Sequence, residues 1–176
     1  MPLKIAIIAS RANSFSETFI KAHVDLLKGK KTYIHGRVYP YFIGSGPILK
    51  PVSWRQVLSD RLENHLGIAQ PINRRELGLY QYLKRSKTDV VLAEYGINGT
   101  KVLPVCKKLG VPLVVHFHGA DAYKHKTLKE EKEKYPAMFR YASRVIAVST
   151  DMVQQLKHLG CPEEKIILNP CGPSKA

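Results

Sequence analysis

The sequence predicts a doubly wound α/β domain, in which a parallel sheet carries helices on both faces. Six short apolar segments of strand length are spread along the 176 residues, and stretches with helical periodicity lie between them. Alternation of this kind favours parallel strands joined by crossover helices. A chain of this length with 44% hydrophobic residues is expected to bury a substantial core.

The strands are predicted from apolar, β-branched runs that end in polar or glycine-containing loops. Residues 4–9 show the pattern well, because an unbroken apolar run meets a loop of small polar residues at Ser10. The expected strands span residues 4–9, 32–38, 88–93, 111–117, 144–148 and 165–168. An aromatic stretch rich in glycine and proline, residues 39–47, is expected to break regular structure.

The helices are predicted from apolar residues at a spacing of three to four and from capping residues at their ends. They are expected from Ser16 to Gly29, over residues 53–66 and 74–85, around Pro104, from Thr127 to Ala142, and from Ser149 to Gly160. Residues 1–168 are therefore assigned to one domain, and residues 169–176 to the start of an interdomain linker.

The charge of the chain is its most unusual property. It has 28 Lys and Arg against 14 Asp and Glu, a formal net charge of +14, and a pI near 9.8. Nucleic acid, an anionic membrane surface and phosphorylated small molecules are all suitable partners for such a chain. Between residues 26 and 59 no acidic residue occurs, and the aromatic stretch lies in this window. Two interpretations are open: the stretch docks on an anionic leaflet, or it packs against the domain itself.

Several classes of protein are excluded by other counts. Three cysteines without a CxxC pair support neither a disulfide framework nor a zinc ribbon. The apolar runs are shorter than a membrane span, and the first residues lack the pattern of a signal peptide. The expected location is the cytoplasm, with peripheral attachment to the inner face of the membrane as an alternative.

Ligands of doubly wound sheets bind beyond the carboxyl ends of the strands, which directs attention to residues 10–17, 94–99 and 116–123. The first of these loops has no glycine, so a dinucleotide or P-loop site is not expected. Ser16 and Glu17 either cap the following helix or bind a polar ligand there.

Two histidines end the fourth strand. A metal site built on His116 and His118 would need a third ligand, and no residues with ligand spacing supply one, so no metal is expected. His118, followed by Gly119, is well placed to hydrogen-bond a ligand. The alternative is a structural histidine, with Asp121 capping the next turn.

Three groups of residues together resemble the amino-terminal half of the family-4 retaining glycosyltransferases, most closely the bacterial enzymes of exopolysaccharide and lipopolysaccharide synthesis. They are Ser16-Glu17-Thr18-Phe19-Ile20, His118-Gly119-Ala120-Asp121-Ala122-Tyr123, and Val145-Ile146-Ala147-Val148-Ser149 with the Met152, Leu156, Gly160 and Pro162 that follow. The resemblance covers nearly the whole chain and implies one Rossmann-like half of a GT-B fold.

The resemblance also implies roles for individual residues. It places Ser16, Glu17 and Thr18 beside the acceptor and the donor phosphates, and His118, Gly119 and Asp121 beside the transferred sugar, with His118 and Asp121 counted as catalytic. Glu94, which opens the second loop, and Ser149, after the fifth strand, complete the substrate-binding set. Ser149 is equally well explained as a helix cap.

The implied activity is transfer of a sugar from a nucleotide-sugar to a glycan or a lipid-linked acceptor with retention of configuration, without a metal or other cofactor. The donor-binding carboxyl-terminal domain is absent, so the isolated chain is expected to be inactive. Two alternatives are a stand-alone subunit that recruits a partner with the donor site, and a basic nucleic-acid-binding module, which charge alone suggests.

Overall fold

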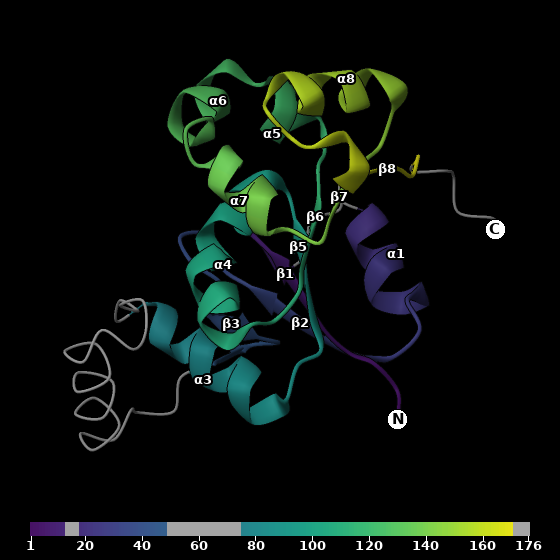
Figure 1. Cartoon of the computed structure of the whole chain (residues 1–176). Helices are drawn as coiled ribbons and strands as arrows, with labels where there is room; N and C mark the ends of the chain where they lie inside the picture. The colour runs from purple at the N-terminus through teal and green to yellow at the C-terminus, as the bar shows by residue number, and fades with distance from the viewer. Residues whose placement is uncertain (13–17, 49–74, 171–176) are drawn as a thin grey trace.

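The computed structural model of the chain describes residues 1–12, 18–48 and 75–170. Its centre is an eight-stranded sheet with the order β4-β3-β2-β1-β5-β6-β7-β8 (Figure 1). The strands are β1 (Lys4–Ala9), β2 (Lys30–His35), β3 (Phe42–Ile43), β4 (Gly46–Pro47), β5 (Val90–Glu94), β6 (Leu113–His116), β7 (Arg144–Ala147) and β8 (Ile166–Leu168). All six predicted strands are present, and they pair in parallel.

The aromatic stretch departs from the prediction. Residues 39–47 were expected to lack regular structure, but β3 and β4 form a small antiparallel hairpin on the outer edge of β2. Gly44 adopts a φ of 59°, a conformation that glycine reaches without steric cost, and this closes the hairpin turn. Short strands of two residues carry no periodicity that a sequence pattern can reveal.

The helices cover both faces of the sheet, as predicted. They are α1 (Thr18–Leu26), α3 (Glu76–Ser86), α4 (Gly96–Leu109), α5 (Gly119–Tyr123), α6 (His125–Glu131), α7 (Tyr135–Tyr141) and α8 (Thr150–His158), followed by a 3-10 turn at Glu163–Lys165. Helix α1 lies on one face, and α3, α4 and α7 lie on the other (Figure 1). The fold is therefore Rossmann-like, with its larger core beneath α3, α4, α7 and α8.

One predicted helix was wrong in extent. The segment from Thr127 to Ala142 is divided into α6 and α7, and α6 begins before Thr127, so that residue is not its cap. Pro136 occupies the first turn of α7, where its missing N–H costs nothing, and it could not continue a helix from α6. The predicted helix over residues 53–66 lies outside the described residues.

Helix α4 lies unusually close to the sheet because two of its residues are glycines. A Cβ atom added to Gly96 would lie 2.4 Å from Cζ of Phe117, and one added to Gly99 would lie 2.5 Å from Sδ of Met138. Real Cβ atoms do not make such contacts, so larger residues would push the helix away from β6 and α7. The two glycines therefore fix the position of α4 beside the carboxyl ends of β5 and β6.

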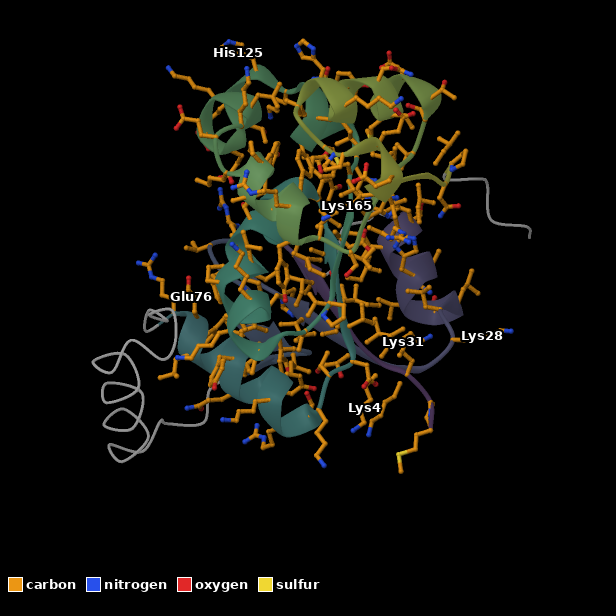
Figure 2. The ribbon with its side chains drawn as sticks, viewed as in Figure 1. Lys4, Lys28, Lys31, Glu76, His125 and Lys165 are labelled. Atoms are coloured by element: carbon orange, nitrogen blue, oxygen red, sulfur yellow. The ribbon has the colours of Figure 1, made fainter. Side chains whose placement is uncertain are left out.

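The predicted membrane patch is divided in space. Lys30 pairs with Lys4 at the start of the parallel strands, whereas the aromatic hairpin follows the other end of β2, about 16 Å away for a six-residue strand. Figure 2 shows Lys28 and Lys31 in the lower right part of the molecule, near Lys4. Within the hairpin region, Phe42 is 39% exposed but Ile48 is buried. Docking on an anionic surface remains a prediction, and no helix in the described residues is long and apolar enough to cross a membrane.

Candidate functional site

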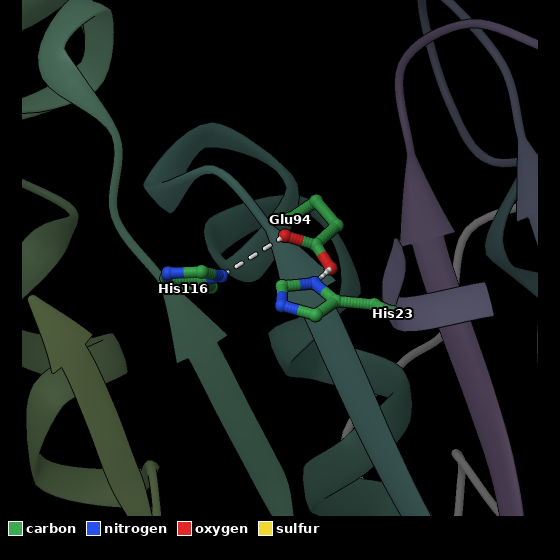
Figure 3. Close-up of side chains that lie close together, drawn as sticks. All are labelled: His23, Glu94 and His116. Carbon is green, nitrogen blue, oxygen red and sulfur yellow. Dashed lines mark hydrogen bonds and ion pairs between the residues drawn. The ribbon is translucent and has the colours of Figure 1, made fainter. Parts of the chain in front are cut away.

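The carboxyl ends of β5 and β6 bring three of the sequence-selected positions together. Glu94 is the last residue of β5 and pairs in register with His116, the last residue of β6. His118 follows two residues later and precedes α5. A fourth residue, His23, reaches the same point from α1, on the face opposite α4 (Figures 1 and 3).

The carboxylate of Glu94 is the centre of this cluster. Its side chain is fully buried, and its Oε1 lies 2.6 Å from Nδ1 of His23. Its Oε2 lies 3.3 Å from Nε2 of His118 and 3.4 Å from Nδ1 of His116. Figure 3 shows the imidazoles of His23 and His116 approaching the carboxylate from two sides. We call these four residues the His–Glu cluster.

The electrostatics of the cluster favour an ionised Glu94. Burial alone raises the pKa of this carboxyl, but the imidazoles of His116, His118 and His23 stabilise the charged form, and together they hold the pKa well below its usual range. For His118, burial lowers the pKa, and the bond to Glu94 only partly opposes this. The structure thus combines a buried anion with a largely neutral His118 that is oriented by it.

Aromatic rings fix the orientation of His118. Phe19 stacks on its imidazole, with the ring centroids 3.9 Å apart and an interplanar angle of 27°. Tyr95 lies against the same ring, at a centroid distance of 4.8 Å. Tyr95 has a φ of 71° and a ψ of 141°, which is strained for a residue with a side chain. Strained residues concentrate at functional sites, and this one lies directly between Glu94 and α4.

Asp121 lies three residues after His118 and hydrogen-bonds backbone N–H groups rather than the imidazoles of the cluster. It is fully buried, its Oδ1 accepts the backbone N–H of His118 at 2.8 Å, and its Oδ2 accepts that of Gly96 at 2.7 Å. Burial raises the pKa of this carboxyl to about 7, and the backbone donors oppose that shift. Asp121 therefore ties the β6–α5 connection to the start of α4, and the cap predicted for it is present.

The other predicted site residues have varied surroundings. Thr18 is exposed at the start of α1, while Ser16 and Glu17 lie outside the described residues. Gly119 is exposed, and a Cβ added to it would meet no atom within 4 Å, so there is open space in front of it. Ser149 caps α8, its Oγ accepting the N–H of Met152 at 3.1 Å. The cap is therefore confirmed, and a substrate contact for Ser149 remains a prediction.

Sequence reasoning missed the contribution of His23. His23 lies within the helix predicted from Ser16 to Gly29, where no role was assigned to it, and it is separated from Glu94 by 71 residues. No local spacing marks such a pair, because only the crossover of α1 over β1 brings them together. The only signal in the sequence was that His23 follows Phe19 and Ile20 at the spacing of the apolar face of its helix.

A separate hollow lies between α8 and the edge strand β8. It is lined by Thr150, Val153, Gln154, Glu163, Ile166 and Leu168. None of these residues belongs to the His–Glu cluster, and the lining offers one carboxylate and a few polar groups without a buried charge. We therefore place the candidate site at the carboxyl ends of β5 and β6.

Comparison with known proteins identifies the family of the chain. Residues 55–173, more than half of the chain, match the family described as Glycosyltransferase Family 4. The chain belongs to this family. The matched range includes β5, β6 and His118.

Curated relatives point to polysaccharide synthesis. The amylovoran biosynthesis glycosyltransferase AmsK of Erwinia amylovora is 33% identical over 86 residues, which cover 48% of this chain and 21% of that protein. The putative colanic acid biosynthesis glycosyltransferase WcaL of Salmonella typhimurium is 30% identical over 87 residues, again 48% of this chain and 21% of the relative. The matched region thus spans about a fifth of the length of these relatives.

Solved structures share the fold at low sequence identity. Anabaena Alr3699/HepE, solved in complex with UDP, has a TM-score of 0.62 at 13% identity, covering 96% of this chain and 44% of that one. MurG of Acinetobacter baumannii has a TM-score of 0.51 at 12% identity, covering 99% and 46%. The chain therefore corresponds to less than half of these proteins, and the predicted relationship to the GT-B fold is confirmed.

Proposed function

We propose that this chain is the acceptor-binding, amino-terminal domain of an enzyme that transfers a sugar from a nucleotide-sugar to a glycan or a lipid-linked acceptor. The observation that carries the proposal is the His–Glu cluster at the carboxyl edge of the sheet, where His118 is oriented by a buried carboxylate and followed by the open Gly119. The exopolysaccharide relatives support a glycan product.

In this proposal the transfer retains the configuration of the sugar. The bond from the anomeric carbon to the phosphate oxygen of the donor breaks, and a bond to the acceptor hydroxyl oxygen forms on the same face. The hydroxyl proton passes to the departing phosphate. His118 orients the sugar and stabilises charge in the transition state, and the step needs neither a general base from this chain nor a metal.

The proposed roles of the remaining residues follow from their surroundings. Thr18 and the adjoining residues of the first loop contact the acceptor and the donor phosphates, and the backbone at Gly119 allows close approach of the sugar. Glu94 holds His118 through Nε2, and Asp121 holds its backbone N–H. Asp121 thus acts in the proposed reaction as a positioning residue.

The donor half of the cleft is proposed to come from a second domain. The structural relatives extend over more than twice the length matched here, since this chain covers 44% of HepE and 46% of MurG. We assign residues 1–168 to the acceptor domain and residues 169–176 to the start of a linker. The isolated 176-residue chain is then inactive in transfer.

Release of nucleoside diphosphate from a panel of nucleotide-sugars tests the proposed function. The natural gene product that carries this chain should release it only when a polysaccharide-repeat acceptor, free or lipid-linked, is added. Failure with every donor and acceptor, in protein that is folded and purified with its natural partners, would contradict the proposal. Activity that requires a co-purifying protein would assign the donor site to a separate subunit.

A lipid-linked acceptor would bring the enzyme to the cytoplasmic face of the membrane. The exposed hairpin residue Phe42 and the exposed Val38 are the apolar contacts proposed for such attachment. Vesicle flotation with neutral and with anionic lipids tests it, because electrostatic docking requires higher recovery with the anionic vesicles.

A further inference from the structure

His116 is unusual even within the His–Glu cluster. Its side chain is fully buried, and neither ring nitrogen makes a hydrogen bond to any residue that the structure describes. Its Nδ1 lies at an ion-pair distance of 3.4 Å from Glu94 without the geometry of a hydrogen bond. A buried polar group without a partner costs about 1–3 kcal/mol, so this arrangement requires an explanation.

The sugar-transfer role proposed above does not use His116 or His23. Both histidines face the carboxylate of Glu94 (Figure 3). The ring centroids of His23 and His116 are only 5.0 Å apart. Two imidazoles and one buried anion therefore converge on a common point between α1 and the ends of β5 and β6.

This convergence has the chemistry of a cation site. One donor atom from each of His23, Glu94 and His116 lies within 4.8 Å of the other two. In a tetrahedral zinc shell with bonds of 2.0–2.1 Å, neighbouring ligand atoms are about 3.3 Å apart. Oε1 of Glu94 lies 2.6 Å from Nδ1 of His23, and Oε2 lies 3.4 Å from Nδ1 of His116, so the direct bond to His23 must open and the carboxylate must turn to admit an ion.

We propose that His23, Glu94 and His116 bind a divalent transition-metal ion, with zinc as the best match. Two histidines and one carboxylate are a common zinc-binding set, in which the fourth position is left for water or another ligand. The bound ion would supply the missing partner of His116.

The proposed ion would act on the structure rather than on the transferred sugar. It would join α1, which carries His23, to the ends of two central strands. The half-buried His23, 21% exposed at its side chain, gives the ion a route from solvent. The sequence had predicted no metal, because the third ligand is supplied from residues far from the histidine pair. Glu94 is shared with the proposed sugar-transfer site, but zinc binding is measured without sugar transfer.

Isothermal titration of the chelator-treated 176-residue chain with zinc chloride tests the proposal. One ion per chain is expected. Glu94→Gln and His23→Ala should each weaken binding by about tenfold or more, since each removes a ligand. His35→Gln is the matched control, because His35 is also buried but bonds the carbonyl of Gly44 outside the cluster, and it should leave the affinity unchanged.

Cobalt substitution gives a second readout that does not depend on sugar transfer. Cobalt bound by this set should produce the visible absorption of a four-coordinate site, and His23→Ala should abolish it. His23 is partly exposed, so this variant is expected to remain folded, which circular dichroism checks.

Two results would overturn the proposal. One is the absence of saturable zinc binding by the folded chain. The other is binding that survives Glu94→Gln and His23→Ala but is lost when the exposed His125 and His158 are replaced by alanine, which would locate the ion on the surface.

Discussion

Replacing Gly96 by alanine tests how closely α4 must approach Phe117, which lies between His116, the last residue of β6, and His118. The added Cβ would lie 2.4 Å from Cζ and 2.6 Å from Cε1 of Phe117, and 3.1 Å from the hydroxyl of Tyr135. Ordinary contact begins at 3.4 Å, so the ring of Phe117 must retreat by about 1 Å. Phe117 is fully buried between His116 and His118 along the chain, so it has no free volume to enter.

The expected loss of stability follows from this overlap. Overpacking of a filled core costs about 1–3 kcal/mol. Alanine has a higher helix propensity than glycine, which stabilises the folded state by up to about 1 kcal/mol and by less at the first position of a helix. We therefore expect the free energy of unfolding to fall by about 1–2 kcal/mol, which lowers the melting temperature of a domain of this size by about 2–8 °C.

Urea unfolding followed by circular dichroism measures this change. Gly119→Ala is the matched control, because Gly119 also begins a helix but its added Cβ meets no atom within 4 Å. That variant should be as stable as the parent or slightly more stable. Equal stability of Gly96→Ala and Gly119→Ala would refute the close packing of α4 described above.

Three further changes probe other parts of the structure. Asp121→Ala removes the acceptor of two buried backbone N–H groups, and each unsatisfied group costs about 1–3 kcal/mol. Urea unfolding should therefore show that the free energy of unfolding falls by at least about 2 kcal/mol. Asp121→Asn keeps one acceptor oxygen, so its free energy of unfolding should fall by less. Ser149→Ala should cost about 1 kcal/mol through loss of the α8 cap, and Ser143→Ala, at an exposed serine outside any helix, is its control. Cys106 and Cys161 are buried with thiol pKa values raised to about 12, so peptide mapping after iodoacetamide treatment at neutral pH should find both unmodified until urea is added. Rapid labelling of Cys106 in the folded chain would contradict the packing beneath α4.

The sequence predicted the central strands of the sheet well. Residues 5–9 and 111–115 are continuous apolar runs, and such runs in a chain with alternating helices have few places other than a central parallel strand. The direction of the strands then placed Glu94 and His118 at the same edge, since the carboxyl ends of parallel strands lie together.

The remaining features depend on tertiary contacts that no local pattern encodes. His23 meets Glu94 only because α1 crosses back over β1, and the hairpin of β3 and β4 exists because β2 offers it an unpaired edge. The cationic and aromatic halves of the predicted membrane patch are close in sequence, but an extended strand separates them. For the His23–Glu94 pair and for the membrane patch, distance along the chain did not predict distance in space.

Loss of transfer in His118→Ala is the most direct test of the claim that the carboxyl edge of β5 and β6 is the sugar-transfer site. The measurement is the acceptor-dependent rate of nucleoside diphosphate release by the natural gene product, compared with His125→Ala, an exposed histidine at the edge of the molecule (Figure 2). His118→Ala should lower the rate by about 100-fold or more with the fold intact, and His125→Ala should leave it unchanged. A folded His118→Ala enzyme that transfers sugar at the parent rate would contradict the account.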